Sequence, residues 1–492
     1  MQESELTPPP LRPPLHNTSA PRDDEPDAAQ LEKLKKWQEE RMARKLRGEY
    51  ESAILHLAEV VNTNLNNPTR IAAIRVDGAV HTRKSFLGSL VHPYLHAEQP
   101  QTLASVLQTT RSLGSLLQET DIFESVVAKL ERSRDVLAQP GDVDLVFKTR
   151  EKGRFYLNTS TQVGNEEGGA SATCRIRNAF GGAETVEANL AFATKTRVSF
   201  NASLSAPLTH TLRTRGEVSL FGMERDNTSY ASHFEGVRGV KAVIRIGNLV
   251  RGLHEMGYEG VLRHISNLTP TASVSVRNAA GQSIKSSLFH VWTRDTRDDR
   301  LLGTRGSYLK LMQELAGLGG DTSFFKTEAH GQLSRALLPH VTVSFAARTG
   351  LLWPFGDTPA PLPDRFQLGG PTSVRLFRAN SMGPRDGSDS LGGNLYWATG
   401  LSLISDIPRK PHWPVKLHAF VNAGHLDAVD KNRSLEESVK SSIQRASVSA
   451  GLGLVYKLDP VRVEVNFGVP LLSNKGDGKR KGIQVGIGLD FL

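Results

Sequence analysis

The stretch Gly482-Ile483-Gln484-Val485-Gly486-Ile487-Gly488-Leu489-Asp490-Phe491-Leu492 alternates apolar side chains with polar residues or glycine. Successive side chains of a β-strand point to opposite faces, so the pattern predicts a strand with one apolar and one polar face. The apolar face would carry Ile483, Val485, Ile487, Leu489 and Phe491. An unpaired strand of this kind is an aggregation hazard, so another strand of the chain is expected to pair with its edge.

The same alternation recurs from residue 153 onward, and about 16 strand-like segments fit between residues 153 and 492. A soluble sandwich or propeller would bury the apolar faces against one another, but no blade repeat is visible. A membrane barrel turns these faces to lipid and leaves Ser, Thr, Asn and Gly facing a wet interior. We therefore predict a 16-stranded antiparallel transmembrane β-barrel in which strand 482–491 meets strand 153–163.

Composition excludes several classes of protein and of binding site. The 492 residues contain no run of roughly 18–20 apolar residues, the length that a transmembrane helix needs. The single cysteine, Cys174, excludes an intrachain disulfide framework and a cysteine-based zinc site. The net charge is +9, but Lys and Arg are scattered, which favours solvated faces and lumen walls over a nucleic-acid partner. Residues 1–30, Pro-rich with an acidic cluster, resemble neither a secretory signal nor a mitochondrial transit peptide.

The chain divides into four expected segments. Residues 1–28 are Pro-rich and poor in large apolar side chains, which predicts disorder. Residues 29–69 are expected to form a helical lead-in, either docked on the surface or binding a partner. Residues 70–150 fit the order strand, helix, helix, strand, strand, which predicts one small N-terminal α+β domain. Residues 151–492 would form the barrel.

The sequence contains no arrangement typical of an enzyme. His92 and His96 are spaced i, i+4, but no Glu occupies the position of a zinc-protease motif and Pro93 interrupts the stretch. Gly451 and Gly453 lie in a strand without the following helix that a dinucleotide site needs. No Gly-x-Ser-x-Gly nucleophile motif occurs. We expect no catalytic activity, no bound metal and no cofactor.

The longest stretch without alternation lies between Leu352 and Leu391. It contains Arg365-Phe366-Gln367-Leu368-Gly369-Gly370 and Ser373-Val374-Arg375-Leu376-Phe377. Long ordered loops in compact proteins usually have a function, and Arg375 would be a cation on an apolar tip. Composition alone equally allows a solvent-exposed loop in which this arginine has no role.

These motifs, followed by Leu391-Gly392-Gly393-Asn394 and Phe420-Val421-Asn422-Ala423-Gly424, resemble the signature of the Omp85 superfamily of outer-membrane insertases and transporters. The block at 70–150 looks like its polypeptide-transport-associated (POTRA) domain. The resemblance covers nearly everything from residue 70 onward. It implies a barrel of 16 strands whose sixth external loop folds into the lumen and places its Arg against an interior acidic group.

One POTRA-like block and a basic chain without a recognisable signal peptide are most similar to the eukaryotic branch, the central barrel of the mitochondrial sorting and assembly machinery. This implies an insertase of the mitochondrial outer membrane with its POTRA domain in the intermembrane space. Implied partners are β-barrel precursors, peripheral cytosolic metaxin-like subunits, the preprotein entry complex and the lipid bilayer, but no nucleic acid. A polypeptide-export channel or passive pore of the same superfamily is the alternative function.

The resemblance assigns the lumen-loop motif to Val374, Arg375, Leu376 and Phe377, with support from Arg365, Phe366, Gly369, Gly370, Asn422 and Ser402. Three positions depart from the family pattern. Leu376 replaces the usual Gly, Asn422 replaces the usual Asp, and Ser402 occupies a position that is often Glu. What Arg375 contacts, a lumen carboxylate or neutral hydrogen-bonding groups, therefore stays open.

The two strands that would close the barrel are expected to form a lateral gate. The first strand would contribute Phe155, Leu157, Asn158 and Thr159, and the last Gln484, Gly486, Gly488, Leu489 and Phe491. Glycines 486 and 488 should weaken the closing pairing, and the exposed edge of the first strand would template an incoming strand. Gln484, Gly486, Leu489 and Phe491 also match the sorting pattern of this family's substrates, although a good closing strand explains them equally well.

Overall fold

The computed structural model describes residues 28–46, 59–95, 102–136, 138–164, 167–209, 212–356, 359–410, 413–429, 434–458, 461–488 and 491–492. Contacts along the chain divide it into two compact units, residues 1–75, 92–114 and 128–147, and residues 76–91, 115–127 and 148–492. The segment 1–28 that we expect to be disordered lies almost wholly outside the described residues. So do residues 47–58 of the helical lead-in.

The N-terminal part contains α1 (Ala28–Leu46), β1 (Arg70–Asp77), α3 (Lys84–Leu95), α4 (Leu103–Glu119), β2 (Phe123–Arg132) and β3 (Asp142–Glu151). The three strands form a small sheet in the order β1-β3-β2. Apolar side chains recur at helical spacing in α4, where Leu113 and Leu117 are fully buried, and β3 buries Leu145 and Phe147. The element order is the one predicted for residues 70–150. Within the described ranges, no helix combines the length and the apolar character needed to cross a membrane.

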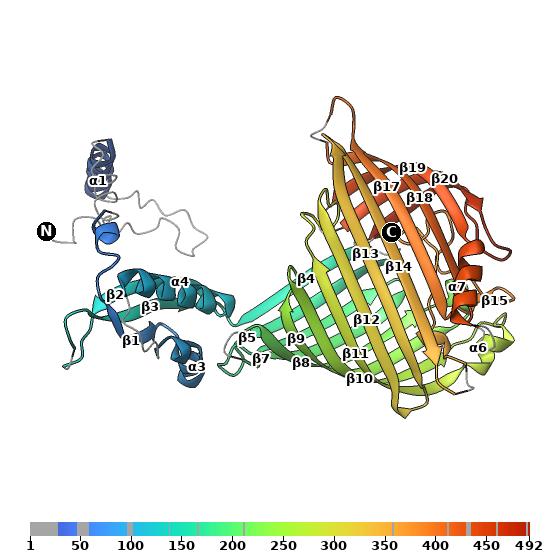
Figure 1. Cartoon of the computed structure of the whole chain (residues 1–492), viewed down its shortest axis with the longest axis horizontal. Helices are drawn as coiled ribbons and strands as arrows, with labels where there is room; N and C mark the ends of the chain where they lie inside the picture. Colours follow the sequence, from blue (N-terminus) through green and yellow to red (C-terminus); the bar gives the residue numbers. More distant parts are fainter. Residues whose placement is uncertain are drawn as a thin grey trace. The chain divides into compact units, whose positions relative to one another are not determined.

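The remaining chain forms the 16-stranded sheet that the alternation predicts, with every neighbouring pair antiparallel and consecutive along the wall (Figure 1). Its strands are β4 (Phe155–Gly164), β5 (Glu167–Arg177), β6 (Thr185–Ala193), β7 (Thr196–Pro207), β8 (Thr214–Asp226), β9 (Phe234–Asn248), β10 (Gly252–Ser266), β11 (Gly281–Asp295), β12 (Gly306–Gly320), β13 (Phe324–Leu338), β14 (Val341–Pro354), β17 (Leu395–Asp406), β18 (Val415–Asp427), β19 (Ser447–Leu458), β20 (Val461–Leu472) and β21 (Gly482–Gly488). Helices α5 (Thr228–Ala231), α6 (Val274–Asn278), η2 (Leu362–Asp364) and α7 (Leu435–Gln444) and the short strands β15 (Arg385–Asp386) and β16 (Asp389–Ser390) lie in the connections.

The two faces of each strand differ as expected for a barrel wall in lipid. In β20, Val465 and Phe467 are exposed, whereas Glu464 and Asn466, which alternate with them, are fully buried. In β21, Ile483 and Val485 are exposed and Gln484 is buried. Apolar side chains therefore point outward and polar ones point into the lumen, as expected for a barrel whose outer face contacts lipid.

The sheet does not close by hydrogen bonding. Its end strands are β4 and β21, which come within 8 Å of each other at their Cα atoms, but the described residues form no ladder between them. The expected pairing of strand 153–163 with strand 482–491 is therefore not made.

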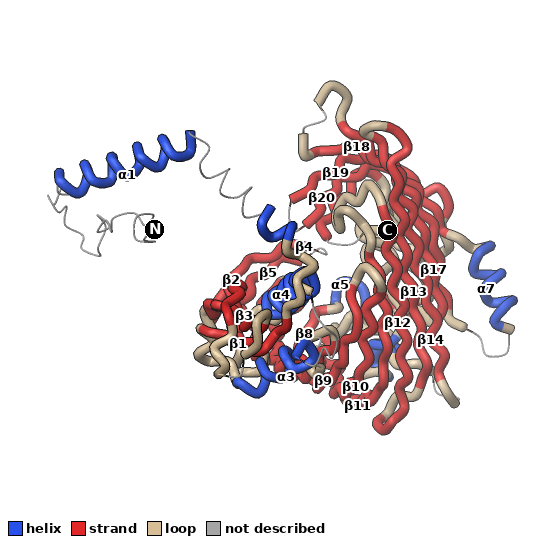
Figure 2. Tube along the Cα trace, turned by 60° about the vertical axis from the view of Figure 1, so that its left-hand side comes forward, coloured by secondary structure: helices blue, strands red, loops and turns tan. Residues whose placement is uncertain are grey.

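The connection from β14 to β17 lies inside the wall of strands. Figure 2 shows non-strand chain within the ring of strands beside the C label. The connection's apolar side chains Phe366, Leu368, Val374 and Phe377 belong to one buried cluster with wall residues such as Phe324 and Tyr396. The loop is thus packed into the lumen rather than extended over the rim.

Candidate functional site

Two glycines and short backbone bridges shape the lumen loop. Gly369 and Gly370 have φ of +103° and +119°, the left-handed region that favours glycine. The backbone of Phe366 bridges to Gly393, and that of Phe377 bridges to Lys479. The arginine of the first motif, Arg365, donates from Nε to the carbonyl of Ala360 (2.9 Å). Four of the expected support residues, Arg365, Phe366, Gly369 and Gly370, therefore belong to the loop itself.

The tip of the loop carries Arg375, which is fully buried. Its Nε donates to Oε2 of Glu464 (2.8 Å) and its Nη2 donates to Oε1 (3.1 Å), a bidentate pair with a carboxylate that is also fully buried. Its Nη1 donates to Oδ1 of Asn422 (3.1 Å) and to the main-chain oxygen of Leu492 (2.6 Å). The partners of Arg375 are thus a lumen carboxylate, supplied by β20, the side-chain amide of Asn422 and the main-chain oxygen of Leu492.

Glu464 lies at the centre of a polar network on the inner wall. Nη2 of Arg462 contacts its Oε1 (2.5 Å), and Nδ2 of Asn466 donates to its Oε2 (2.8 Å). His418 bridges Asn466 and Ser402, with Nδ1 3.3 Å from Asn466 Oδ1 and Nε2 3.0 Å from Ser402 Oγ. Ser402, expected to support the loop directly, is therefore connected to it only through this network. The acid that pairs with Arg375 is therefore Glu464 in β20, and position 402 in β17 is a serine.

The residues beside Arg375 are held by neighbouring strands. The backbone N–H of Leu376 donates to Oε1 of Gln484 (2.7 Å), whose Nε2 donates to the carbonyl of Phe377 (3.0 Å). Ser449 Oγ donates to the carbonyl of Arg375 (2.7 Å). One side-chain amide of the terminal strand thus satisfies two backbone groups of the loop, which ties β21 to the loop tip.

Leu376 has a φ of +66°, a strained conformation for a residue with a side chain. Glycine at this position would remove about 1–3 kcal/mol of backbone strain. The Leu376 side chain is fully buried, however, and truncating a buried leucine costs about 2–5 kcal/mol. Leu376→Gly should therefore destabilise the protein, yet less than Leu376→Ala, which loses the side chain and keeps the strain. Denaturant unfolding of both variants in detergent micelles tests this order, and a more stable alanine variant would contradict the strain.

The structure places the predicted last strand differently at its end. Phe491 was expected on the outer apolar face, but it is buried, with the guanidinium groups of Arg462 and Arg375 4.9 and 5.7 Å from its ring centroid. The N–H of Leu492 donates to the carbonyl of Thr372 (3.2 Å), so these residues turn toward the loop. The cation–π contacts and the burial of the Phe491 ring stabilise this turn. Leu489 lies outside the described residues.

The other predicted gate residues differ in how exposed they are. Phe155 and Leu157 in β4 are about three-quarters exposed, and Asn158 and Thr159 are also exposed. An added Cβ at Gly486 would lie 2.9 Å from Cβ of Pro371, so glycine at this position lets the loop pack closely against β21. Gly488 is buried at the end of β21.

A second anchor of the loop was not predicted. Asp364, in η2, accepts hydrogen bonds from Nη1 and Nη2 of Arg263 in β10 (2.6 and 2.7 Å), and both side chains are buried. Nζ of Lys326 in β13 donates to the carbonyl of Asp364 (2.8 Å) and lies 4.6 Å from the ring centroid of Phe366. The only sequence signals were an acid next to Arg365 and a charged residue on the inner face of β10. Neither indicates that the two meet.

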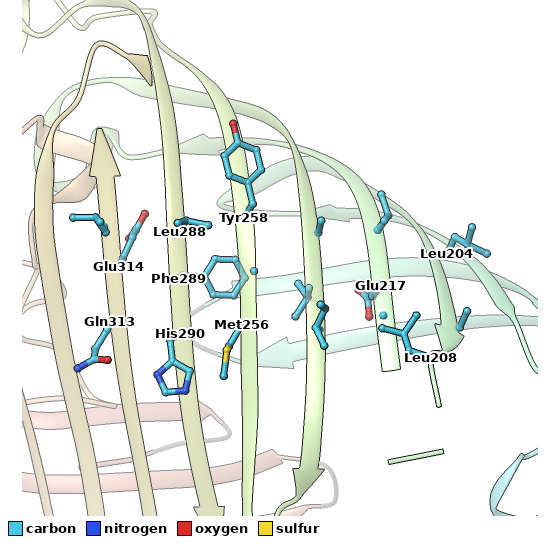
Figure 3. A pocket seen from close by; sticks show the side chains of 18 of the residues that line it. Leu204, Leu208, Glu217, Met256, Tyr258, Leu288, Phe289, His290, Gln313 and Glu314 are labelled. Atoms are coloured by element: carbon cyan, nitrogen blue, oxygen red, sulfur yellow. The ribbon is translucent and has the colours of Figure 1, made fainter. Parts of the chain in front are cut away.

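The barrel wall also has a hollow of about 810 Å³ between β7 and β13 (Figure 3). Exposed apolar side chains dominate its lining, including Met256, Tyr258 and Leu288. Because these side chains belong to the outward set of the alternation, the hollow does not belong to the polar lumen site. Within the described part of the chain, no group of three or more His, Cys, Asp or Glu side chains is arranged to hold a metal ion.

Comparisons with known proteins agree with this geometry. The profile of the Omp85 superfamily domain matches residues 178–491. The SAM50-like protein of Schizosaccharomyces pombe is 36% identical over 451 residues, covering 90% of this chain and 95% of that protein. The human sorting and assembly machinery component 50 homolog is 31% identical over 434 residues, covering 87% and 91%. BamA from Haemophilus ducreyi shares the fold, with a TM-score of 0.71 at 17% identity over 85% of this chain and 84% of that one. The chain therefore belongs to the Omp85 superfamily and, within it, to the SAM50 family.

Proposed function

We propose that this protein folds β-barrel precursors and inserts them into the mitochondrial outer membrane at the seam between β4 and β21. One observation carries the proposal. The two end strands of the sheet lie close together, but no ladder joins them in the described residues. Unpaired backbone groups are costly in hydrocarbon, so each free edge favours a strand that can pair with it. An incoming precursor strand satisfies that demand.

The chemistry of insertion is strand addition. Main-chain hydrogen bonds from the edge of β4 provide affinity, and the alternation of side chains sets the register, because a slip of one residue would turn apolar side chains into the lumen. The outward Phe155 and Leu157 match a strand whose own apolar face points to lipid. Pairing energy and water exclusion drive the step, and neither nucleotide nor metal takes part.

The partners follow from the printed names of the relatives, which call them components of a sorting and assembly machinery. We extend this membership to the present chain. Its substrates would be β-barrel precursors, and its neighbours peripheral cytosolic metaxin-like subunits and the preprotein entry complex. Residues 70–150 would act as a POTRA domain in the intermembrane space, and the barrel would contact the lipid bilayer and no nucleic acid.

The alternative function, a passive pore or polypeptide-export channel, requires an open lumen. In this structure the loop from β14 to β17 is held inside by buried ion pairs at Asp364 and Arg375. A stable, large conductance in planar bilayers, together with normal barrel assembly after depletion of the protein, would favour the pore.

A disulfide across the seam tests the insertase. In a Cys174→Ser chain, we pair a cysteine at Leu157 or Thr159 in β4 with one at Ile483, Val485 or Ile487 in β21, and carry forward the pair that oxidises fully. Because the seam must open to receive a strand, we expect oxidation to abolish the assembly of radiolabelled β-barrel precursors in isolated mitochondria, and reduction to restore it.

The matched control is a disulfide between Val465 and Val485, which are register partners in the intact β20–β21 ladder. It adds the same crosslink without bridging the seam, so assembly should continue. Unchanged assembly after complete oxidation of the seam pair would refute opening at this site.

A further inference from the structure

Glu464 has two cationic partners that come from different segments. Arg375 belongs to the lumen loop, whereas Arg462 belongs to the same strand as Glu464, two residues earlier. All three side chains are buried. The Glu464 carboxylate thus contacts two guanidinium groups, one from the loop and one from its own strand.

Arg462 has a hydrogen-bond partner outside the lumen loop. Its Nη1 donates to the carbonyl of Leu301 (3.2 Å) in the turn between β11 and β12. That turn is itself fastened, because Asp299 pairs with Lys457 of β19. Burial raises the pKa of Asp299, but the hydrogen bonds from Lys457 and from the N–H groups of Leu302 and Leu301 outweigh it, so its pKa lies below the usual value.

Arg462 also has unused hydrogen-bonding capacity. Its Nη2 contacts one oxygen of Glu464, and its buried Nε has no hydrogen-bond partner among the described residues. The other oxygen of Glu464 is held by Nε of Arg375. A guanidinium binds a carboxylate best through two parallel N–H groups. If Arg375 left, Nε of Arg462 could take the oxygen that Arg375 releases.

We propose that Arg462 is a positioning residue that keeps Glu464 paired when Arg375 withdraws, which makes the lumen loop releasable. A buried carboxylate without a cation is strongly unfavourable, and breaking a buried pair by removing one partner costs about 3–5 kcal/mol. Arg462 removes most of that cost from the withdrawn state, and its like charge weakens the hold on Arg375 in the docked state. Both effects favour withdrawal. The proposal concerns the loop alone and does not depend on the insertase function.

Cysteine labelling of the purified full-length chain in detergent micelles tests the proposal. In a Cys174→Ser background, Val374→Cys places a small reporter at a fully buried position beside Arg375. A membrane-impermeant maleimide labels it only when the loop withdraws. Because Arg462→Gln leaves Glu464 without a cationic partner when the loop withdraws, we expect this substitution to slow labelling by about tenfold or more. A reporter at Ser287, buried in β11, should label at an unchanged rate in all variants and monitors wall stability.

The sign of the effect separates this role from a purely structural one. If Arg462 only stabilised the wall, Arg462→Gln would speed labelling at Val374→Cys, with or without a change at Ser287→Cys, and the proposal would be wrong. It would equally fail if the reporter never labelled with Arg462 in place. Arg462→Lys keeps the charge but lacks the paired N–H groups of a guanidinium, so it should slow labelling by a few-fold. Faster labelling of this variant would overturn the proposal. This test remains valid even if the glutamine variant does not fold.

Discussion

Glu464→Gln is expected to destabilise the barrel by about 3–5 kcal/mol, because it removes the carboxylate that pairs with the buried guanidinium groups of both Arg375 and Arg462. The amide is close in shape to the carboxylate, so the loss measures charge and not packing. Denaturant unfolding in detergent micelles gives the free energy, and limited proteolysis of the loop reports whether its tip has left the lumen.

The comparison with Arg375→Gln sharpens this result. That variant removes one cation and leaves Glu464 paired with Arg462, so its cost should be clearly smaller. A matched control is Glu255→Gln, an inward carboxylate of β10 whose partner Arg245 is 39% exposed and which should cost about 1 kcal/mol or less. If Glu464→Gln were no worse than this control, the buried network would not hold the loop.

The sequence predicted the wall because the hydrophobic period of a strand depends only on which face meets lipid. Alternation predicts an apolar outer and a polar inner face, and in β20 the structure exposes Val465 and Phe467 and buries Glu464 and Asn466. The same pattern failed at Phe491, because alternation cannot reveal where a strand ends. There the attraction of an aromatic ring to two buried arginines outweighs continuation of the strand.

The site was harder to predict than the wall. The loop motif identified Arg375, but its acid was sought at Ser402, the position that the family pattern suggests. Glu464 lies on the polar face of its strand, but 89 positions separate it from Arg375 in the sequence. Which inner side chain meets the loop depends on the curvature of the wall and the depth of the loop, and neither leaves a local pattern in the sequence. The contact between Arg263 and Asp364 could not be predicted for the same reason.

Arg263→Met is expected to destabilise the barrel by about 3–5 kcal/mol, because it leaves Asp364 buried without its bidentate partner. Lys326 does not replace Arg263, since its ammonium group donates to the backbone carbonyl of Asp364 and not to the carboxylate. Arg263 belongs to β10, far along the sheet from β20, so its loss should release the base of the loop while the contacts of Arg375 persist.

A double-mutant cycle isolates this anchor from general damage to the wall. Asp364→Asn alone leaves Arg263 unpaired, whereas Arg263→Met with Asp364→Asn removes both charges and should recover part of the loss, giving a coupling energy of about 2–3 kcal/mol. Protease accessibility near Leu362 should rise in each single variant before global unfolding. Additive losses in the cycle would mean that Arg263 stabilises β10 alone and that the loop is held only at its tip. Coupling of the expected size would instead make the loop a strut with ionic anchors on β10 and β20, so that displacement of either wall strand acts on the other through the lumen.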